Sequence, residues 1–188
     1  MNEELKTYIN SLVDDVPHYV YEGLLSVFCI GAILLLTWKG KKAWPEIAKL
    51  LLVEYVFLIY CSTVIFRNEI SEWTLFLTPL WSYSRQDLII ENIMNVVVFI
   101  PVGLFLFITQ IKRTYLFKNG IISIVSGLVL SVSIESLQLI FKKGYTELDD
   151  VIHNTLGCFI GCTLCLVIAK TWSCSMNWCR SHWGKERL

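Results

Sequence analysis

Five apolar runs follow one another along the chain, at residues 19–38, 47–66, 93–110, 120–141 and 151–169. Each is close to the roughly 20 residues that a helix needs to cross about 30 Å of hydrocarbon. A backbone in lipid must satisfy its own hydrogen bonds, so apolar runs of this length favour helices over barrel strands. The pattern therefore predicts an all-α membrane protein, a bundle of about five transmembrane helices.

Composition supports this prediction. Of the 188 residues, 55% are hydrophobic and only 17% are charged, whereas about 25% of the residues of a soluble domain are charged. No repeat, linker or low-complexity segment interrupts the pattern, so we expect one domain over residues 1–188, in the cell membrane as a multi-pass protein. The formal net charge is zero and the sequence shows no clustered basic face, which argues against a nucleic-acid partner.

The basic residues predict the orientation of the bundle, because Lys and Arg are enriched in the cytoplasmic loops of membrane proteins. Of the 16 Lys and Arg residues, eleven fall on one side of the predicted spans, around residues 39–49, 112–118 and 170–187. We therefore expect the N-terminus outside and the C-terminus inside. Residues 1–17 are acidic, with Lys6 as their base, which is typical of an uncleaved first helix and not of a signal peptide.

Acidic and amide side chains gather near one end of the last three apolar runs. Because the directions of the spans alternate, all of them reach the outer boundary of the membrane, where Arg67 follows the second run. Charged groups in a span are costly and usually face the bundle interior, where they mark function. The sequence thus predicts a polar site, whose candidate ligand-binding residues are Arg67, Asn92, Asn95, Glu135, Gln138, Asp149, Asp150, His153 and Asn154.

Some of these positions also have a simpler structural interpretation. Asp149, Glu91 and Asn92 stand where a helix begins, and such side chains cap a helix and complement its dipole. Arg67, at the interface, could extend its charge toward water. Glu135 lies well inside the fourth run, where capping does not apply, so it needs a partner, a proton or water.

One helix face of the fifth run carries small and polar residues at i, i+4, i+7 and i+11, namely Asp150, Asn154, Gly157 and Gly161. The spacing of the two glycines lets another helix approach closely, and polar residues on the same face then point at that neighbour. We therefore expect Asp150 to be buried. Helix-mediated self-association through Gly157 and Gly161 is a further expectation.

The loop at residues 68–90 is the longest between two spans and is rich in aromatic residues. Such side chains favour the head-group level of a membrane. We expect the loop beside the polar site, either as part of an aromatic belt or as a lid.

Cysteine and histidine give little sign of a metal. The fifth run carries Cys158, Cys162 and Cys165 on one face, which favours packing. The two cysteines and the histidine at residues 174–182 do not have the spacing of a standard zinc site. A metal held by His153 and the carboxylates of the polar site is a weaker alternative, so we expect no metal and no cofactor.

Four sequence blocks occur in a specific order: Arg67 after the second run, ENIMNVVVFIPVG at 91–103, SIESLQ at 133–138 and ELDDVIHNTLG at 147–157. In this combination the chain resembles the VanZ-like family of bacterial membrane proteins, over about residues 66–169. The resemblance implies a multi-pass protein related to an accessory factor for resistance to the lipoglycopeptide teicoplanin in Gram-positive bacteria. It implies no established reaction.

The chain departs from this family at one basic position. The resemblance implies an arginine shortly before the aspartate pair, where this sequence has Lys142-Lys143-Gly144-Tyr145. The basic role then falls to Lys142, to Lys143 or to Arg67.

Three classes of function fit these features. The first, which we favour, is an accessory protein that binds an amphiphile at the outer leaflet, such as a membrane lipid, a lipid-linked cell-envelope precursor or a lipoglycopeptide. The second is an intramembrane enzyme that modifies a lipid head group, with Glu135 and Asp150 as candidate catalytic acid and base. The third is a transporter, which is disfavoured because five spans without an inverted repeat offer no alternating-access pair.

Overall fold

The computed structural model describes residues 16–85, 88–110 and 116–183, without the side chains of residues 41–42, 116 and 172–183. Its long helices are α2 (His18–Lys39), α3 (Trp44–Tyr60), α4 (Ile89–Thr109), α5 (Leu116–Phe141) and α6 (Leu148–Trp183). All five are long and apolar enough to cross a membrane, so the predicted all-α bundle of five spans is confirmed. The orientation with the N-terminus outside stays a prediction.

Short elements connect these helices. A 3-10 turn, η1 (Gly40–Ala43), joins α2 to α3, and α3 continues into a π-helical turn, η2 (Cys61–Ile65). The loop between α3 and α4 contains strand β1 (Leu75–Phe76) and a second 3-10 turn, η3 (Trp81–Ser84). Strand β2 (Thr146–Glu147) lies between α5 and α6.

The two strands pair in parallel, with Leu75 opposite Thr146 and Phe76 opposite Glu147. The hydrophobic pattern does not predict this ribbon, because two residues are too few to show the period of a strand. Its effect is to tie the loop after α3 to the start of α6.

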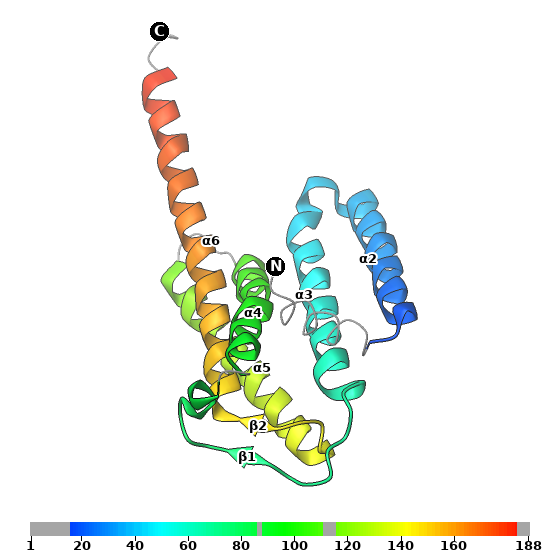
Figure 1. Cartoon of the computed structure of the whole chain (residues 1–188). Helices are drawn as coiled ribbons and strands as arrows, with labels where there is room; N and C mark the ends of the chain where they lie inside the picture. The colour runs from blue at the N-terminus through cyan, green and yellow to red at the C-terminus, as the bar shows by residue number, and fades with distance from the viewer. Residues whose placement is uncertain (1–15, 86–87, 111–115, 184–188) are drawn as a thin grey trace.

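The helices alternate in direction, with α4, α5 and α6 at the centre, α3 against α4, and α2 against α3 at the periphery (Figure 1). The alternation brings the ends of α3 and α5 and the starts of α4 and α6 to the end of the bundle where β1 and β2 lie (Figure 1). We call this the polar end, because the candidate site residues all come from the segments that meet there or from the adjoining turns.

Helices α4 and α6 make the most extensive contact in the bundle, and glycines allow it. A side chain at Gly157 would overlap the backbone carbonyl of Val96, and one at Gly161 would overlap that of Ile100. Gly103 on α4 faces the backbone of α6 in the same way. The predicted close approach of a neighbouring helix is thus made within one chain, and self-association through these glycines stays a prediction.

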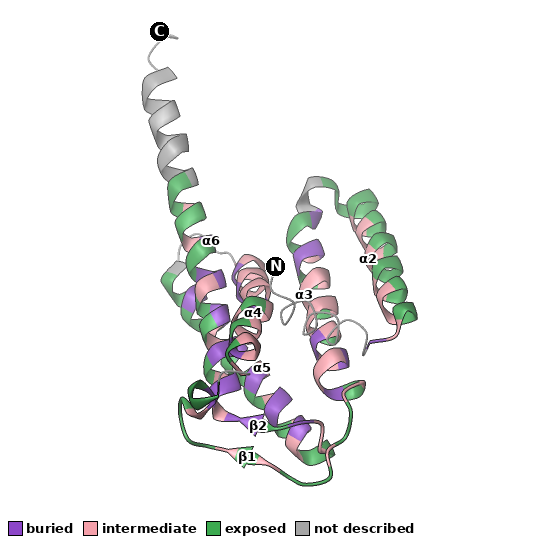
Figure 2. Ribbon diagram, viewed as in Figure 1, coloured by how far each residue is buried: buried purple, intermediate pink, exposed green. Residues whose placement is uncertain are grey.

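Burial is concentrated where α4, α5 and α6 meet (Figure 2). Phe99 and Val102 of α4, Ile134 of α5 and Cys158 of α6 form an apolar cluster there. By contrast, none of the described residues of α2 is buried, and most of them are exposed (Figure 2).

The cysteine stripe of α6 belongs to this core. Cys158, Cys162 and Cys165 are all buried among apolar side chains of the neighbouring helices, as packing residues would be. The side chains of Cys174, Cys179 and His182 lie outside the described residues.

Candidate functional site at the polar end of the bundle

Two adjoining groups of side chains occupy the polar end. The first, which we call the loop anchor, holds the loop after α3 against α4 and α6 and consists of Leu80, Ser82, Tyr83, Asn92, Asp149 and His153. The second, which we call the carboxylate cluster, comes from the segments of α3 to α6 and consists of Arg67, Glu91, Asn95, Glu135, Gln138, Glu147 and Asp150.

Asp149 is the centre of the loop anchor. Its Oδ1 accepts the backbone N–H of Leu80 at 2.6 Å, and its Oδ2 accepts both the N–H and the hydroxyl of Ser82 at 2.9 and 2.6 Å. Asn92 of α4 donates to the same Ser82 hydroxyl oxygen at 2.9 Å. Leu80 has a φ of 61°, which side chains rarely adopt. The first turns of α4 and α6 therefore hold η3 in a fixed, strained conformation, a larger role for Asp149 than capping its own helix.

Aromatic contacts extend the loop anchor. The Tyr83 hydroxyl lies 2.9 Å from Nε2 of His153, whose ring is buried. Phe76 of β1 stacks on Trp81 of η3, with ring centroids 4.1 Å apart. The loop at residues 68–90 is thus an ordered layer on the polar end over the part that the structure describes.

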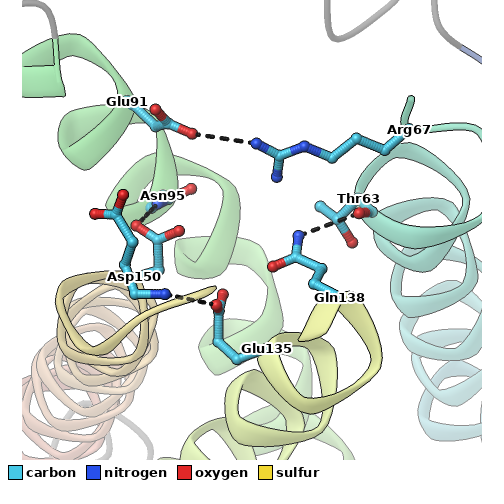
Figure 3. Close-up of polar contacts among 8 residues, drawn as sticks. Thr63, Arg67, Glu91, Asn95, Glu135, Gln138 and Asp150 are labelled. Atoms are coloured by element: carbon cyan, nitrogen blue, oxygen red, sulfur yellow. Dashed lines mark hydrogen bonds and ion pairs between the residues drawn. The ribbon is translucent and has the colours of Figure 1, made fainter. Parts of the chain in front are cut away.

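Glu135 and Asp150 are the buried carboxylates that the helices α5 and α6 bring to the carboxylate cluster, only 6% and 8% exposed, and Glu147 of β2 is buried beside them. The backbone N–H of Glu147 donates to Oε2 of Glu135 at 3.1 Å, and Asn95 donates to Oδ1 of Asp150 at 2.8 Å (Figure 3). Among the described residues, each carboxylate accepts one hydrogen bond. A buried carboxylate needs more compensation than this, so neither group is explained by packing alone.

The charges that act on Asp150 are mostly of its own sign. They come from Glu135, Glu91 and Glu147, against one guanidinium, that of Arg67. Buried together, such groups favour a shared proton, a cation or a hydrogen-bond donor between them. The cluster is therefore an acidic site that favours a positive partner.

Arg67 supplies the basic side chain of the carboxylate cluster. Its Nη2 lies 3.7 Å from Oε1 of Glu91 (Figure 3). Gly144, with a φ of 111°, packs so closely that an added Cβ would lie 2.7 Å from the guanidinium carbon. The two lysines that follow α5 are engaged elsewhere: Lys142 lies over the Trp73 ring at 4.3 Å, and Lys143 pairs with Glu69 at 3.1 Å.

Gln138 links the carboxylate cluster to the π-helical turn. Its Nε2 donates to the Thr63 carbonyl at 3.1 Å (Figure 3), a carbonyl inside η2, and π-turns are frequent at functional sites. Its Oε1 is buried without a hydrogen-bond partner among the described residues, and the amide oxygen points toward Glu135 (Figure 3). An unpaired buried acceptor is costly, so Gln138 is a further group of the cluster whose acceptor atom has no described hydrogen-bond donor.

Glu147 is the member of the carboxylate cluster that lies in strand β2, outside the spans. Burial raises the pKa of its carboxyl above the ordinary value of 4.5, and the charges of Glu91 and Asp149 raise it further. Glu147 therefore holds a proton more readily than an exposed glutamate, and it brings a further buried carboxyl group of the cluster into the loop layer.

The family model of VanZ/LLP1 matches residues 50–169, more than half of the chain. The chain belongs to the VanZ/LLP1 family. The Protein VanZ of Enterococcus faecium is 42% identical over 74 residues, which is 39% of this chain and 43% of that protein, so the chain aligns with less than half the length of this curated relative. No solved structure matches.

The VanZ/LLP1 segment contains every residue of the loop anchor and of the carboxylate cluster, whereas α2 lies outside it. The part of this VanZ-like membrane protein that the family model matches therefore comprises the core of the bundle and its polar end. The structure divides the residues that the sequence grouped as one site. The carboxylate cluster contains Arg67, Asn95, Glu135, Gln138 and Asp150, while the loop anchor contains Asn92, Asp149 and His153.

Asn154 stands apart from both groups. Its Nδ2 donates to the Ser131 hydroxyl at 2.9 Å and joins α6 to α5. Residues that the sequence did not list as ligand-binding are Ser82, Tyr83 and Glu147. Tyr83 had a signal as one of the aromatic residues of the loop, and Glu147 as the first residue of the ELDD block, whereas Ser82 had none. In the described part of this VanZ-like chain, no three His, Cys, Asp or Glu residues are placed to hold one metal ion.

Proposed function

We propose that this VanZ-like protein acts in the cell membrane by binding an amphiphile at its polar end. The head group lies at the carboxylate cluster and the apolar part lies against the lipid-facing side of the bundle. The observation that carries the proposal is a buried, incompletely satisfied polar cluster at one end of an otherwise apolar bundle. Protein pockets combine apolar walls with a few convergent polar groups in this way.

The loop layer supports this proposal. Trp73, Leu77, Leu80 and Tyr83 are each more than half exposed although they are large and apolar. Side chains of this kind favour the head-group level of a membrane. They lie in the loop that the anchor holds over the polar end, so an amphiphile there would meet aromatic surface and the acidic cluster together.

The biological role that we propose is a contribution to teicoplanin resistance or to homeostasis of the cell envelope. The ligand is then the lipoglycopeptide itself or a lipid-linked envelope precursor. The support is the similarity to Protein VanZ, combined with a site suited to amphiphiles. The relative covers only part of this chain, so the role needs its own test.

That test uses a teicoplanin-susceptible Gram-positive host that lacks a related protein. We expect expression of the chain to raise the minimum inhibitory concentration of teicoplanin, and Glu135→Gln or Asp150→Asn to abolish the increase at equal membrane levels. Glu72→Gln is the matched control, because Glu72 is an exposed carboxylate in the loop at residues 68–90 and does not belong to the carboxylate cluster. Full resistance with both site variants would exclude the site from this role.

An enzymatic function is the second candidate. Glu135 and Asp150 are buried in one cluster and interact electrostatically, and paired carboxyl groups in different environments serve as acid and base. Mass spectrometry of membrane lipids with and without the protein tests this candidate. A lipid whose head group changes only with the unaltered protein, and not with Glu135→Gln, would favour the enzyme over simple binding.

The proposal also requires the polar end to face outward. We expect a cysteine introduced by Glu72→Cys to react with a membrane-impermeant maleimide on intact cells, in excess over the labelling of the unaltered protein. Labelling only after the cells are opened would place the polar end inside.

A further inference from the structure

Hydrogen-bond acceptors exceed donors inside the carboxylate cluster. The described donors are the Glu147 N–H, the Asn95 amide and the Arg67 guanidinium. An ionised carboxylate offers about four acceptor sites, yet Glu135 and Asp150 each accept one hydrogen bond from the residues that the structure describes. The demand for a donor is therefore built into the site before any ligand binds.

Gln138 shows this independently of the charges. The residue is 2% exposed, and Nε2 of its side-chain amide donates a hydrogen bond to the Thr63 carbonyl. Because of that bond, the amide presents its oxygen and not its nitrogen toward Glu135 (Figure 3). The oxygen has no described partner, so a neutral acceptor is aimed into an acidic site.

The electrostatics indicate the sign of the missing partner. Three carboxylates and one guanidinium act on Asp150, and the guanidinium of Arg67 is already shared with Glu91. An anionic head group, such as a phosphate, would add repulsion. A proton on one carboxyl supplies a single donor, whereas a primary ammonium group supplies three donors and a positive charge.

We propose that the carboxylate cluster recognises the primary ammonium group of a membrane amphiphile, which donates hydrogen bonds to Glu135, Gln138 and Asp150. This inference rests on the proposed function and names the chemistry of its ligand. The ammonium group could belong to an aminophospholipid or to an amine-bearing lipoglycopeptide, and both present the same donors.

The test compares head groups on one alkyl chain. The full-length protein in phosphatidylcholine nanodiscs is titrated with dodecylammonium, dodecyltrimethylammonium and dodecyl phosphate, with binding followed by calorimetry. We expect dodecylammonium to bind about tenfold or more tightly than the trimethyl compound, which keeps the charge but has no N–H donor, the effect of one lost charge-assisted hydrogen bond. Dodecyl phosphate is expected to bind weakest.

Isosteric variants place the effect at the cluster. Glu135→Gln and Asp150→Asn keep an oxygen for the Glu147 N–H and for Asn95, so we expect them to fold and to lose the preference for dodecylammonium. Glu72→Gln should keep it. Competition by phosphatidylethanolamine in the nanodisc and by teicoplanin in solution then separates the two sources of the amine.

The possible outcomes distinguish recognition of the ammonium group from amphiphile binding in general. Saturable binding of all three amphiphiles with equal affinity would overturn ammonium recognition and leave amphiphile binding intact. An ammonium preference that survives both site variants would also overturn it, because the amine would then bind elsewhere. Absence of saturable binding would overturn both. The head-group series uses the unaltered protein, so it decides the question even if a variant folds poorly.

Discussion

The loop anchor and the carboxylate cluster adjoin one another at the polar end, yet they place a carboxylate in opposite environments. Asp149 accepts three hydrogen bonds from the loop. Its neighbour Asp150 accepts one from the described residues, and the charges that act on it come mostly from other carboxylates, with Arg67 opposing them. Hydrogen bonds to a carboxylate favour its charged form and fix its partners, while burial among carboxylates does the reverse.

This difference teaches how structure and function divide between adjacent residues. A carboxylate such as Asp149, whose two oxygens both accept hydrogen bonds from the loop, stabilises the fold and has little capacity left for a ligand. An under-satisfied carboxylate such as Glu135 or Asp150 costs stability and keeps that capacity. We therefore expect variants of the loop anchor to act on stability and variants of the carboxylate cluster to act on binding.

The sharpest way to break this comparison is the same substitution at the two adjacent positions. Both oxygens of Asp149 accept N–H donors, so an amide in Asp149→Asn must turn its own N–H group toward one of them. We expect a loss of about 2–3 kcal/mol in stability there, and a change of about 0.5 kcal/mol or less for Asp150→Asn. Unfolding in detergent measures both.

Binding of the ammonium probe should show the opposite order, with the larger loss for the Asp150 variant. Asp150→Asn should abolish binding of the ammonium probe in a well-folded protein, while the Asp149 variant should retain it wherever it stays folded. Equal losses of stability at the two positions would show that the division into two groups is wrong.

Part of this arrangement can be predicted from sequence. The apolar runs set the number of spans, and alternation of direction then places Arg67, Glu135 and Asp150 at one end. That inference needs only the hydrophobic pattern and the cost of charge in a membrane. Likewise, the spacing of Gly157 and Gly161 predicts close packing of α6, which α4 provides.

The division between Asp149 and Asp150 could not be predicted, because it depends on the path of a loop. Donors reach Asp149 only because β1 and β2 pair over two residues each and Leu80 adopts a positive φ. Neither feature has a periodic signal. Glu147 was overlooked for the same reason, since it lies between apolar runs and enters the cluster through its strand.

Gly144→Ala tests whether the position of Arg67 matters to the carboxylate cluster. The positive φ and the contact with the guanidinium both oppose a side chain, so we expect a loss of about 1–2 kcal/mol in stability and, because the guanidinium must move, a changed affinity for dodecylammonium. Gly23→Ala is the matched control, because no atom lies within 4 Å of a Cβ built there. Similar losses for both glycines would mean that the contact with Arg67 has no particular importance.

The ion pair between Arg67 and Glu91 should contribute little to stability, whereas the charge of Arg67 should weaken the binding of an ammonium group. The two side chains are 32% and 28% exposed and their atoms 3.7 Å apart, so a double-mutant cycle with Arg67→Gln and Glu91→Gln should give a coupling below about 1 kcal/mol. Arg67→Gln also removes the cation that opposes the carboxylates. We expect it to bind dodecylammonium more tightly than the unaltered protein, and weaker binding would contradict the acidic site.

The smallest effect concerns pH. Because the pKa of Glu147 is raised in the folded protein, its folded state binds a proton more tightly than its unfolded state does. The stabilisation is complete below the ordinary carboxyl pKa of 4.5 and is lost as the pH rises through the raised value. Glu147→Gln should remove this part of the pH dependence when unfolding is followed from pH 4 to pH 8. Glu72→Gln should leave the profile unchanged, and an unaltered profile for Glu147→Gln would show that the folded protein does not raise the pKa of Glu147.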